Sequence, residues 1–184
     1  KENEIMVNFF NQLSNVCHDV LYSNESLLYY LRIRRGLTNE TIKSYKLGAF
    51  PENISDLYLK HGMNPVVLRE KGIIWNADQS QFQFFPLVIP IKDVNGKEIA
   101  IGARTLLSDK KRKKLGIPKY RNSVYKKTSY LFGLDRAVKA IRETNKVFVV
   151  EGYFDAIMAY QKGIKNVFAT SGTIFAERQM AILS

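Results

Sequence analysis

The sequence predicts an α+β fold for its N-terminal part, with helices followed by a small antiparallel sheet, and an incomplete α/β fold for its C-terminal part. Apolar residues at helical spacing dominate the first third of the chain, and β-branched and aromatic residues dominate the middle. The last third alternates apolar runs with helical segments, an order that favours parallel strands. We therefore expect two regions, residues 1–145 and residues 146–184.

Helices are predicted throughout the first third. Ile5, Phe9, Leu13, Val16 and Val20 recur every three or four residues, a pattern typical of an amphipathic helix, here over residues 4–22. Capping residues and glycine breaks predict two more, and two further short helices are expected after them. These further helices cover residues 25–35, 38–46, 54–60 and 65–70.

Strands are predicted in the middle of the chain, over residues 73–75, 82–91 and 98–105. Asn95 and Gly96 form a strong hairpin turn signal between the last two, because both residues tolerate a positive φ angle. Residues 108–128 are expected to form a basic loop, and residues 131–144 a helix.

The C-terminal third is predicted to run strand, helix, strand, helix. Residues 147–150 are an unbroken apolar run, which is typical of a strand buried on both faces. A helix over residues 153–162, a strand over residues 166–169 and a helix from about residue 175 follow.

The charge of the chain favours a polyanionic partner. Its 28 Lys and Arg residues against 17 Asp and Glu give a net charge of +11. Ten of these cations lie between Arg104 and Lys127, a segment with a single acid, Asp109. There is no run of about 18 apolar residues that could cross a membrane, so we expect no membrane partner and a cytoplasmic location.

Cys17 is the only cysteine, and the only histidines are His18 and His61. These residues cannot form an internal disulfide or supply the ligands of a structural zinc ion, so we expect no zinc site. Cys17 is expected to be a small buried apolar residue.

Two basic segments are candidates for phosphate binding. Residues 110–114 are all Lys or Arg and fit either a solvated loop or a surface that follows a phosphate backbone. Residues 119–123 mix cations with Tyr120, Asn122 and Ser123, a combination that can bind a triphosphate, stack a base and fix hydroxyl groups. Ordinary packing of Tyr120 is the alternative.

Two carboxylates follow the apolar run of residues 147–150. Glu151 lies at the carboxyl end of the predicted strand, where open α/β sheets place their sites, and Asp155 lies in the first turn of the next helix. The two can share a cation or divide acid and base roles, although Asp155 can also serve only the helix dipole. Thr170 and Ser171 follow the second strand, as further site residues or as a helix cap.

Several segments, in this order, resemble the catalytic core of DnaG-type bacterial DNA primases, and the last two resemble the first half of the Toprim fold, which is Rossmann-like. The similarity covers nearly the whole chain from about residue 5. The matching segments are Tyr30-Leu31 with residues 34–37, residues 47–49, residues 90–93 with Asn95-Gly96 and residues 102–104, residues 118–123, Lys127 with residues 131–134, residues 150–155, and Gly172-Thr173 with Gln179.

The resemblance implies RNA primer synthesis on single-stranded DNA with ribonucleoside triphosphates as substrates, Mg²⁺ or Mn²⁺ as cofactor and a replicative helicase as partner. It assigns catalysis to Glu151, Asp155 and Lys127, with both carboxylates as metal ligands. The nucleotide-binding residues that it implies are Arg104, Lys119, Tyr120, Asn122 and Ser123. The expected DNA-binding residues are Arg34, Arg35, Lys111, Arg112, Lys113, Arg121 and Lys126.

The sequence also departs from the family pattern. The second acidic cluster, Asp-x-Asp, is absent, so we expect the chain to be inactive or nearly so by itself. The spacer before Lys127 is short, and Lys126 can hold the family's lysine role instead. Two other functions remain open: another Toprim enzyme, such as a topoisomerase or nuclease, or a single-stranded-DNA-binding module without catalysis.

Overall fold

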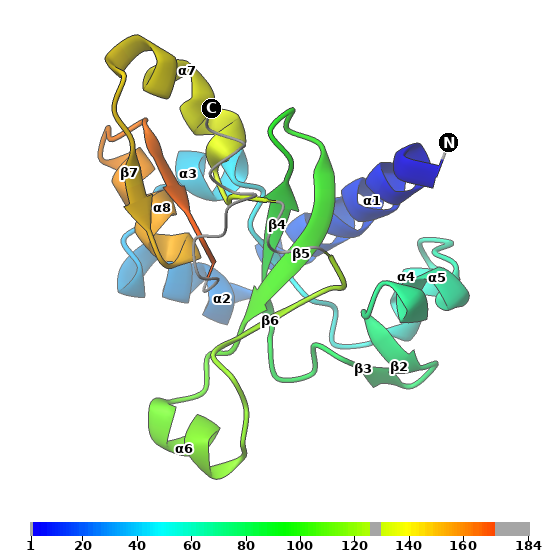
Figure 1. Cartoon of the computed structure of the whole chain (residues 1–184). Helices are drawn as coiled ribbons and strands as arrows, with labels where there is room; N and C mark the ends of the chain where they lie inside the picture. Colours follow the sequence, from blue (N-terminus) through cyan, green and yellow to red (C-terminus); the bar gives the residue numbers. More distant parts are fainter. Residues whose placement is uncertain (1, 126–129, 172–184) are drawn as a thin grey trace. The chain divides into compact units, whose positions relative to one another are not determined.

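The computed structural model describes residues 2–125 and 130–171, with side chains from residue 4, and the chain divides into two compact units (Figure 1). The first unit comprises Lys1–Pro90 and Ala100–Tyr125, and the second comprises Ile91–Ile99 and Lys126–Ser184. The division after residue 145 remains a prediction. Helix α7, Leu134–Thr144, which that division assigns to the N-terminal region, lies in the second unit.

Helix α1, Glu2–Tyr22, confirms the first predicted helix. Its buried face is shifted from the predicted one, because Phe10 and Cys17 are fully buried whereas Ile5 is 65% exposed. The helix packs on β1, Gly48–Ala49, so closely that a Cβ on Gly48 would lie 2.7 Å from the Cβ of Cys17. This close approach explains why Cys17 is buried, as predicted.

The next helix is not α-helical throughout. Helix α2, Glu25–Tyr29, is capped by Asn24 and continues as a π-helical turn, η1, over Tyr30–Arg34. Gly36 then ends the segment with a φ of 66°. The remaining predicted helices of the first unit are confirmed as α3 (Asn39–Ser44), α4 (Ser55–Leu59) and α5 (Pro65–Glu70).

A four-stranded sheet with the order β1-β4-β5-β6 forms the centre of the first unit (Figure 1). Its longer strands are β4, Leu87–Lys92, and β5, Glu98–Arg104, which are buried over nearly their whole length. Strands β2, Ile74–Asn76, and β3, Gln79–Ser80, form a separate antiparallel pair. The predicted antiparallel sheet is confirmed.

The predicted hairpin turn at Asn95 and Gly96 is confirmed, because it joins the neighbouring strands β4 and β5. Gly96 has a positive φ, and the Asp93 carboxylate accepts the backbone N–H groups of Asn95 and Lys97. Two other details of the predicted middle region are wrong. Residues 82–86 are not a strand: Phe82 and Phe85 pack into the core from a turn.

The second correction concerns residues 108–128, which are not merely a loop. Ser108 caps a short helix, α6, over Asp109–Lys114, and Tyr120–Asn122 form β6, the fourth strand of the sheet. Backbone pairing with β5 fixes β6, a long-range effect that the local sequence does not reveal.

In the second unit, the described residues include the parallel strands β7 (Phe148–Val150) and β8 (Val167–Ala169), with helix α8 (Tyr153–Gln161) between them in sequence. The parallel pairing is confirmed, but the prediction that the first strand is buried on both faces is wrong. Phe148 is 55% exposed and Val149 is 48% exposed, whereas β8 is fully buried. The helix predicted near residue 175 lies outside the described residues.

Helix α7 begins at Leu134, three residues later than predicted, because Phe132 exchanges two backbone hydrogen bonds with Ala169 and Gly133 adopts a φ of 86°. Phe132 thereby forms an antiparallel bridge with Ala169, the last residue of β8. Among the described residues, we find no helix that combines the length and apolarity needed to cross a bilayer.

Candidate functional site

The predicted carboxylates lie at the carboxyl end of β7. Glu151 follows the strand directly, Gly152 caps α8, and Asp155 lies in the first turn of that helix. The Asp155 Oδ2 would be 2.7 Å from a Cβ on Gly152, so this carboxylate folds back over the glycine. Both carboxylates are exposed and can reach an ion in solution.

The end of β8 lies beside this edge. The Thr170 backbone N–H donates to the carbonyl oxygen of Val150 at 3.0 Å, which holds the residues after the two strands together. No cluster of three His, Cys, Asp or Glu side chains suited to a metal occurs within residues 4–125 and 130–171. Glu151 and Asp155 therefore offer part of a ligand set for a divalent cation, which prefers about six oxygen ligands.

Four of the five predicted nucleotide-binding residues lie on or beside β6, and the fifth, Arg104, is paired with them from β5. Arg104 is opposite Tyr120 in the ladder, and Gly102 is opposite Asn122. An Arg104 Nη1–H group donates to the Tyr120 hydroxyl at 2.6 Å, and the guanidinium carbon lies 5.2 Å from the centroid of the Tyr120 ring. The two predicted residues thus form one preorganised pair.

The environment of Tyr120 links this pair to the π-helical turn. Burial raises the pKa of Tyr120, while the positive charge of Arg104, its hydrogen bond and the charge of Arg35 offset part of the increase. Arg35 itself donates from Nε to the Tyr30 hydroxyl at 2.8 Å, with its guanidinium carbon 5.4 Å from the ring centroid. Arg34 is exposed, so the two predicted DNA-binding arginines have different surroundings.

Tyr30 was not selected by sequence reasoning. An aromatic residue and an arginine five positions apart do not face each other at ordinary α-helical spacing, which brings together residues three and four apart. The π-helical turn aligns them, and such turns are frequent at functional sites. The only sequence signal for this contact was that Tyr30 and Arg35 both lie in the first segment that resembles the family.

The remaining nucleotide-site candidates differ in exposure. Lys119 is exposed and its carbonyl oxygen accepts the Thr105 N–H at 3.2 Å. Ser123 is buried, and its Oγ accepts the backbone N–H of Ile101 at 3.0 Å. Ser123 is therefore placed to hold β6 against β5, while the side chain of Lys119 is available to a ligand.

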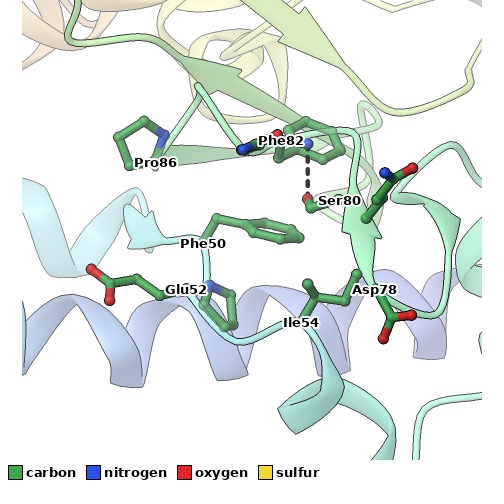
Figure 2. Close-up of a pocket in the computed structure, with 10 residues that line it drawn as sticks. Phe50, Glu52, Ile54, Asp78, Ser80, Phe82 and Pro86 are labelled. Atoms are coloured by element: carbon green, nitrogen blue, oxygen red, sulfur yellow. Dashed lines mark hydrogen bonds between the residues drawn. The ribbon is translucent and has the colours of Figure 1, made fainter.

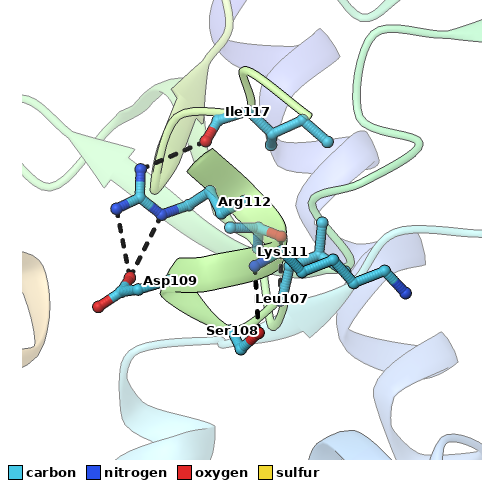
Figure 3. Close-up of polar contacts among 7 residues, drawn as sticks. Leu107, Ser108, Asp109, Lys111, Arg112 and Ile117 are labelled. Atoms are coloured by element: carbon cyan, nitrogen blue, oxygen red, sulfur yellow. Dashed lines mark hydrogen bonds and ion pairs between the residues drawn. The ribbon is translucent and has the colours of Figure 1, made fainter. Parts of the chain in front are cut away.

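The basic helix α6 presents some of its cations to solvent and uses one internally (Figure 3). Lys111 and Lys113 are exposed. Arg112 contacts the Asp109 carboxylate at 3.2 Å and donates to the carbonyl oxygen of Ile117 at 3.3 Å. Arg112 thus fixes the turn after the helix. The other two predicted basic site residues, Lys126 and Lys127, lie outside the described residues.

Arg121 lies between Tyr120 and Asn122 on β6, so its side chain leaves the opposite face of the strand. Its Nη2 donates to the Gln81 Oε1 at 2.8 Å, and its guanidinium carbon lies 5.3 Å from the Trp75 ring centroid. The strand therefore separates Tyr120 and Asn122, two of the predicted nucleotide-binding residues, from this predicted DNA-binding residue.

Two cavities that the sequence did not predict are formed by described residues of the first unit. The larger, about 440 Å³, has an apolar floor of Phe50 and Phe82 with Glu52 and Asp78 in its lining (Figure 2). It contains no Lys or Arg and none of the predicted site residues. The smaller, about 220 Å³, is lined in part by Arg121.

Comparison with known proteins identifies two family models that match the chain. The DNA primase catalytic core, N-terminal domain, matches residues 17–138, and the Toprim domain matches residues 145–184. A DNA primase from Synechocystis sp. is 35% identical over 180 residues, which cover 90% of this chain and 27% of the relative. The chain spans about a quarter to a third of the length of such relatives.

Solved structures show the same similarity. The zinc-binding and RNA polymerase domains of Aquifex aeolicus primase match with a TM-score of 0.84 and 29% identity, over 100% of this chain and 46% of that one. A DnaG primase catalytic domain bound to single-stranded DNA matches with a TM-score of 0.81 and 27% identity, over 98% of this chain and 59% of that one. The predicted fold class and family resemblance are confirmed.

Proposed function

Because the chain belongs to the family of DNA primase catalytic cores, we propose that it serves in the synthesis of short RNA primers on a single-stranded DNA template. The observation that carries this proposal is the Arg104–Tyr120 pair, with the Arg35–Tyr30 pair acting on it electrostatically. Two guanidinium groups near one tyrosine concentrate positive charge, which favours a phosphate ligand. The DNA-bound structure of a related catalytic domain supports the DNA template.

Within this proposal, Arg104 and Lys119 bind the phosphates of a ribonucleoside triphosphate, and Tyr120 and Asn122 orient the nucleotide. Ser123 positions them by fastening β6 to β5. Lys111, Lys113, Arg121 and Arg34 contact the template, and Lys126 or Lys127 supplies the further catalytic lysine. A replicative helicase is the proposed protein partner.

Glu151 and Asp155 are the proposed ligands of Mg²⁺ or Mn²⁺. When bound, a divalent ion neutralises charge on the triphosphate and helps to align it for transfer. The two exposed carboxylates fit such an ion as part of its ligand set only. We therefore expect no primer synthesis by the 184-residue chain alone with either ion; RNA products in a template-dependent assay would refute this expectation.

Binding of fluorescent ATP with Mn²⁺ tests the nucleotide site directly. Lys119→Ala should weaken binding roughly tenfold, the usual scale for a lost charge-assisted hydrogen bond. Lys97→Ala is the matched control, because Lys97 is also an exposed lysine but lies on the β4–β5 turn. Equal losses in both variants would mean that nonspecific charge, not a built site, binds the nucleotide.

Binding of labelled single-stranded DNA across a salt series tests the template surface. Affinity should fall steeply with salt because bound phosphates release counterions. If DNA binds in this way while ATP never does, the chain is a single-stranded-DNA-binding module without nucleotide chemistry, and the primase proposal fails for it.

A further inference from the structure

The cavity of about 220 Å³ lies on the face of β6 that carries Arg121. Two large aromatic side chains that line it are open to solvent, with Trp75 57% exposed and Phe84 45% exposed. A single exposed aromatic residue needs no explanation, but two that share a cavity with an arginine suggest a ligand.

The walls of this cavity are held in place before any ligand arrives. The Arg121 guanidinium lies over the Trp75 ring and donates to Gln81, whose Nε2 donates in turn to the carbonyl oxygen of Ile74 at 3.3 Å. Residues distant in sequence thus fix one indole and one guanidinium plane. Preorganisation of this kind lowers the entropic cost of binding.

Residues 116–118, which follow α6, also line the cavity. Arg112 fixes this turn through its hydrogen bond to the Ile117 carbonyl oxygen (Figure 3). The exposed Lys111 and Lys113 lie on the same short helix as Arg112. Cations that can bind phosphates therefore lie on the helix that precedes the lining residues.

The chemistry of the lining points to a flat, electron-rich group attached to phosphates. The volume is below the roughly 300–1,000 Å³ typical of pockets for whole small-molecule ligands, so one ring system fits better than a complete nucleoside triphosphate. Aromatic rings and arginine planes stack on nucleobases without regard to sequence. No acidic side chain lines this cavity, in contrast to the larger cavity with Glu52 and Asp78.

We propose that Trp75, Phe84 and Arg121 form a stacking site for one unpaired base of single-stranded DNA, on the face of β6 opposite to Tyr120 and Asn122. The site gives the template a fixed point on this face. The role of the bound DNA as a template rests on the proposed primer synthesis, whereas the stacking of a base at this site does not.

Trp75 is the only tryptophan of the chain, so its fluorescence reports this site alone. Titration with an oligothymidylate should quench the emission. An abasic oligonucleotide of the same length and charge is the control for phosphate binding, and it should bind without comparable quenching. An oligouridylate of the same length then compares RNA with DNA at the same site; RNA that quenched at much lower concentrations would overturn the assignment to DNA.

Variants separate stacking from charge. Phe84→Ala should weaken oligothymidylate binding roughly tenfold in a fluorescence anisotropy assay, and Arg121→Lys should weaken it although the charge is retained. Phe148→Ala removes an exposed aromatic residue of the second unit and should leave affinity unchanged. Folding of each variant is checked by circular dichroism.

The outcomes distinguish this site from primer synthesis. Equal quenching by the abasic oligonucleotide, or unchanged affinity in both Phe84→Ala and Arg121→Lys, would overturn the stacking site even if ATP binds as proposed above. Quenching that depends on bases, in a chain that never binds ATP, would support the stacking site while the primase proposal failed.

Discussion

Strands β4 and β7 are both apolar, yet their side chains meet different surroundings. Val88 and Ile89 of β4 are completely buried between the helices and strands of the first unit, whereas Phe148 and Val149 of β7 are about half exposed. An apolar run thus predicts that a strand can be buried, but it does not predict whether other parts of the chain pack over both faces of that strand. The same contrast separates the candidate sites that lie at the ends of these sheets.

The site at the buried sheet is built by contacts within the chain. Arg104 and Tyr120 are paired across β5 and β6, and Arg35 is paired with Tyr30. At the β7–β8 sheet, Glu151 and Asp155 are exposed, and their arrangement depends mainly on the backbone at Gly152. We therefore expect mutations to act through stability and preorganised contacts in the first unit, and through ligand geometry in the second.

The largest expected difference is in stability. Ile89→Ala should cost about 2–5 kcal/mol of unfolding free energy, because it leaves a cavity in a closed core. Phe148→Ala should change stability much less, by about 0.5 kcal/mol, because about half of this residue is already in water. Urea unfolding followed by circular dichroism measures both, and similar losses in the two variants would contradict the contrast between the sheets.

Nucleotide affinity should depend next most strongly on Arg104. A hydrogen bond to a charged group contributes about 1.5–3 kcal/mol, so Arg104→Gln should weaken fluorescent ATP binding by about ten- to 100-fold. Arg136→Gln is a matched control, because Arg136 also lies over a tyrosine, with its guanidinium carbon 5.8 Å from the Tyr160 ring centroid, but in the second unit. If both changes reduce affinity equally, the Arg104–Tyr120 pair has no special role.

The sequence predicted most elements because their signals are local. Asn24 and Thr38 cap helices where capping residues were expected, and the order of the motifs led to the family. It did not predict β6, which pairs with residues 16 to 20 positions earlier in β5. It also did not predict the contact between Arg121 and Trp75, which are 46 positions apart.

The candidate site was predictable in parts for the same reason. Arg104, Tyr120 and Glu151 stood out by residue type and position, but their contacts did not. Tyr30 was missed because its partner is five residues away on a π-helical turn. The sequence also did not show that Arg112, a predicted DNA-binding residue, fixes its own helix and the following turn. Residue type indicates what a side chain can bind, whereas tertiary contacts decide whether it is available.

A smaller effect is expected at Gly152. A methyl group there would displace the Asp155 carboxylate, which is at the end of a flexible side chain and can move. Gly152→Ala should therefore change stability by less than about 1 kcal/mol while weakening Mn²⁺ binding roughly tenfold. Electron paramagnetic resonance of free Mn²⁺ gives the affinity, with Asp155→Asn as the reference for complete loss of that carboxylate. Unchanged Mn²⁺ affinity in both variants would remove Asp155 from the proposed ligand set.

The smallest expected effect is a pH dependence in the second unit. Burial raises the pKa of Asp135, and the charges of Arg136 and Lys92 offset only part of the increase. The folded state then holds the Asp135 proton more tightly than the unfolded state does. The free energy of unfolding therefore falls as pH rises from the unfolded pKa to the higher folded pKa, and it stays lower at every higher pH. Asp135→Asn cannot ionise and should raise the Tm at neutral pH, with the gain disappearing near about pH 3.

Glu143→Gln is the control variant. It removes an exposed acid from the same helix, 3.8 Å from Lys139, and should give no such gain. A gain from Asp135→Asn that is the same at both pH values would mean that the amide improves packing or hydrogen bonding and that ionisation of Asp135 is irrelevant to stability.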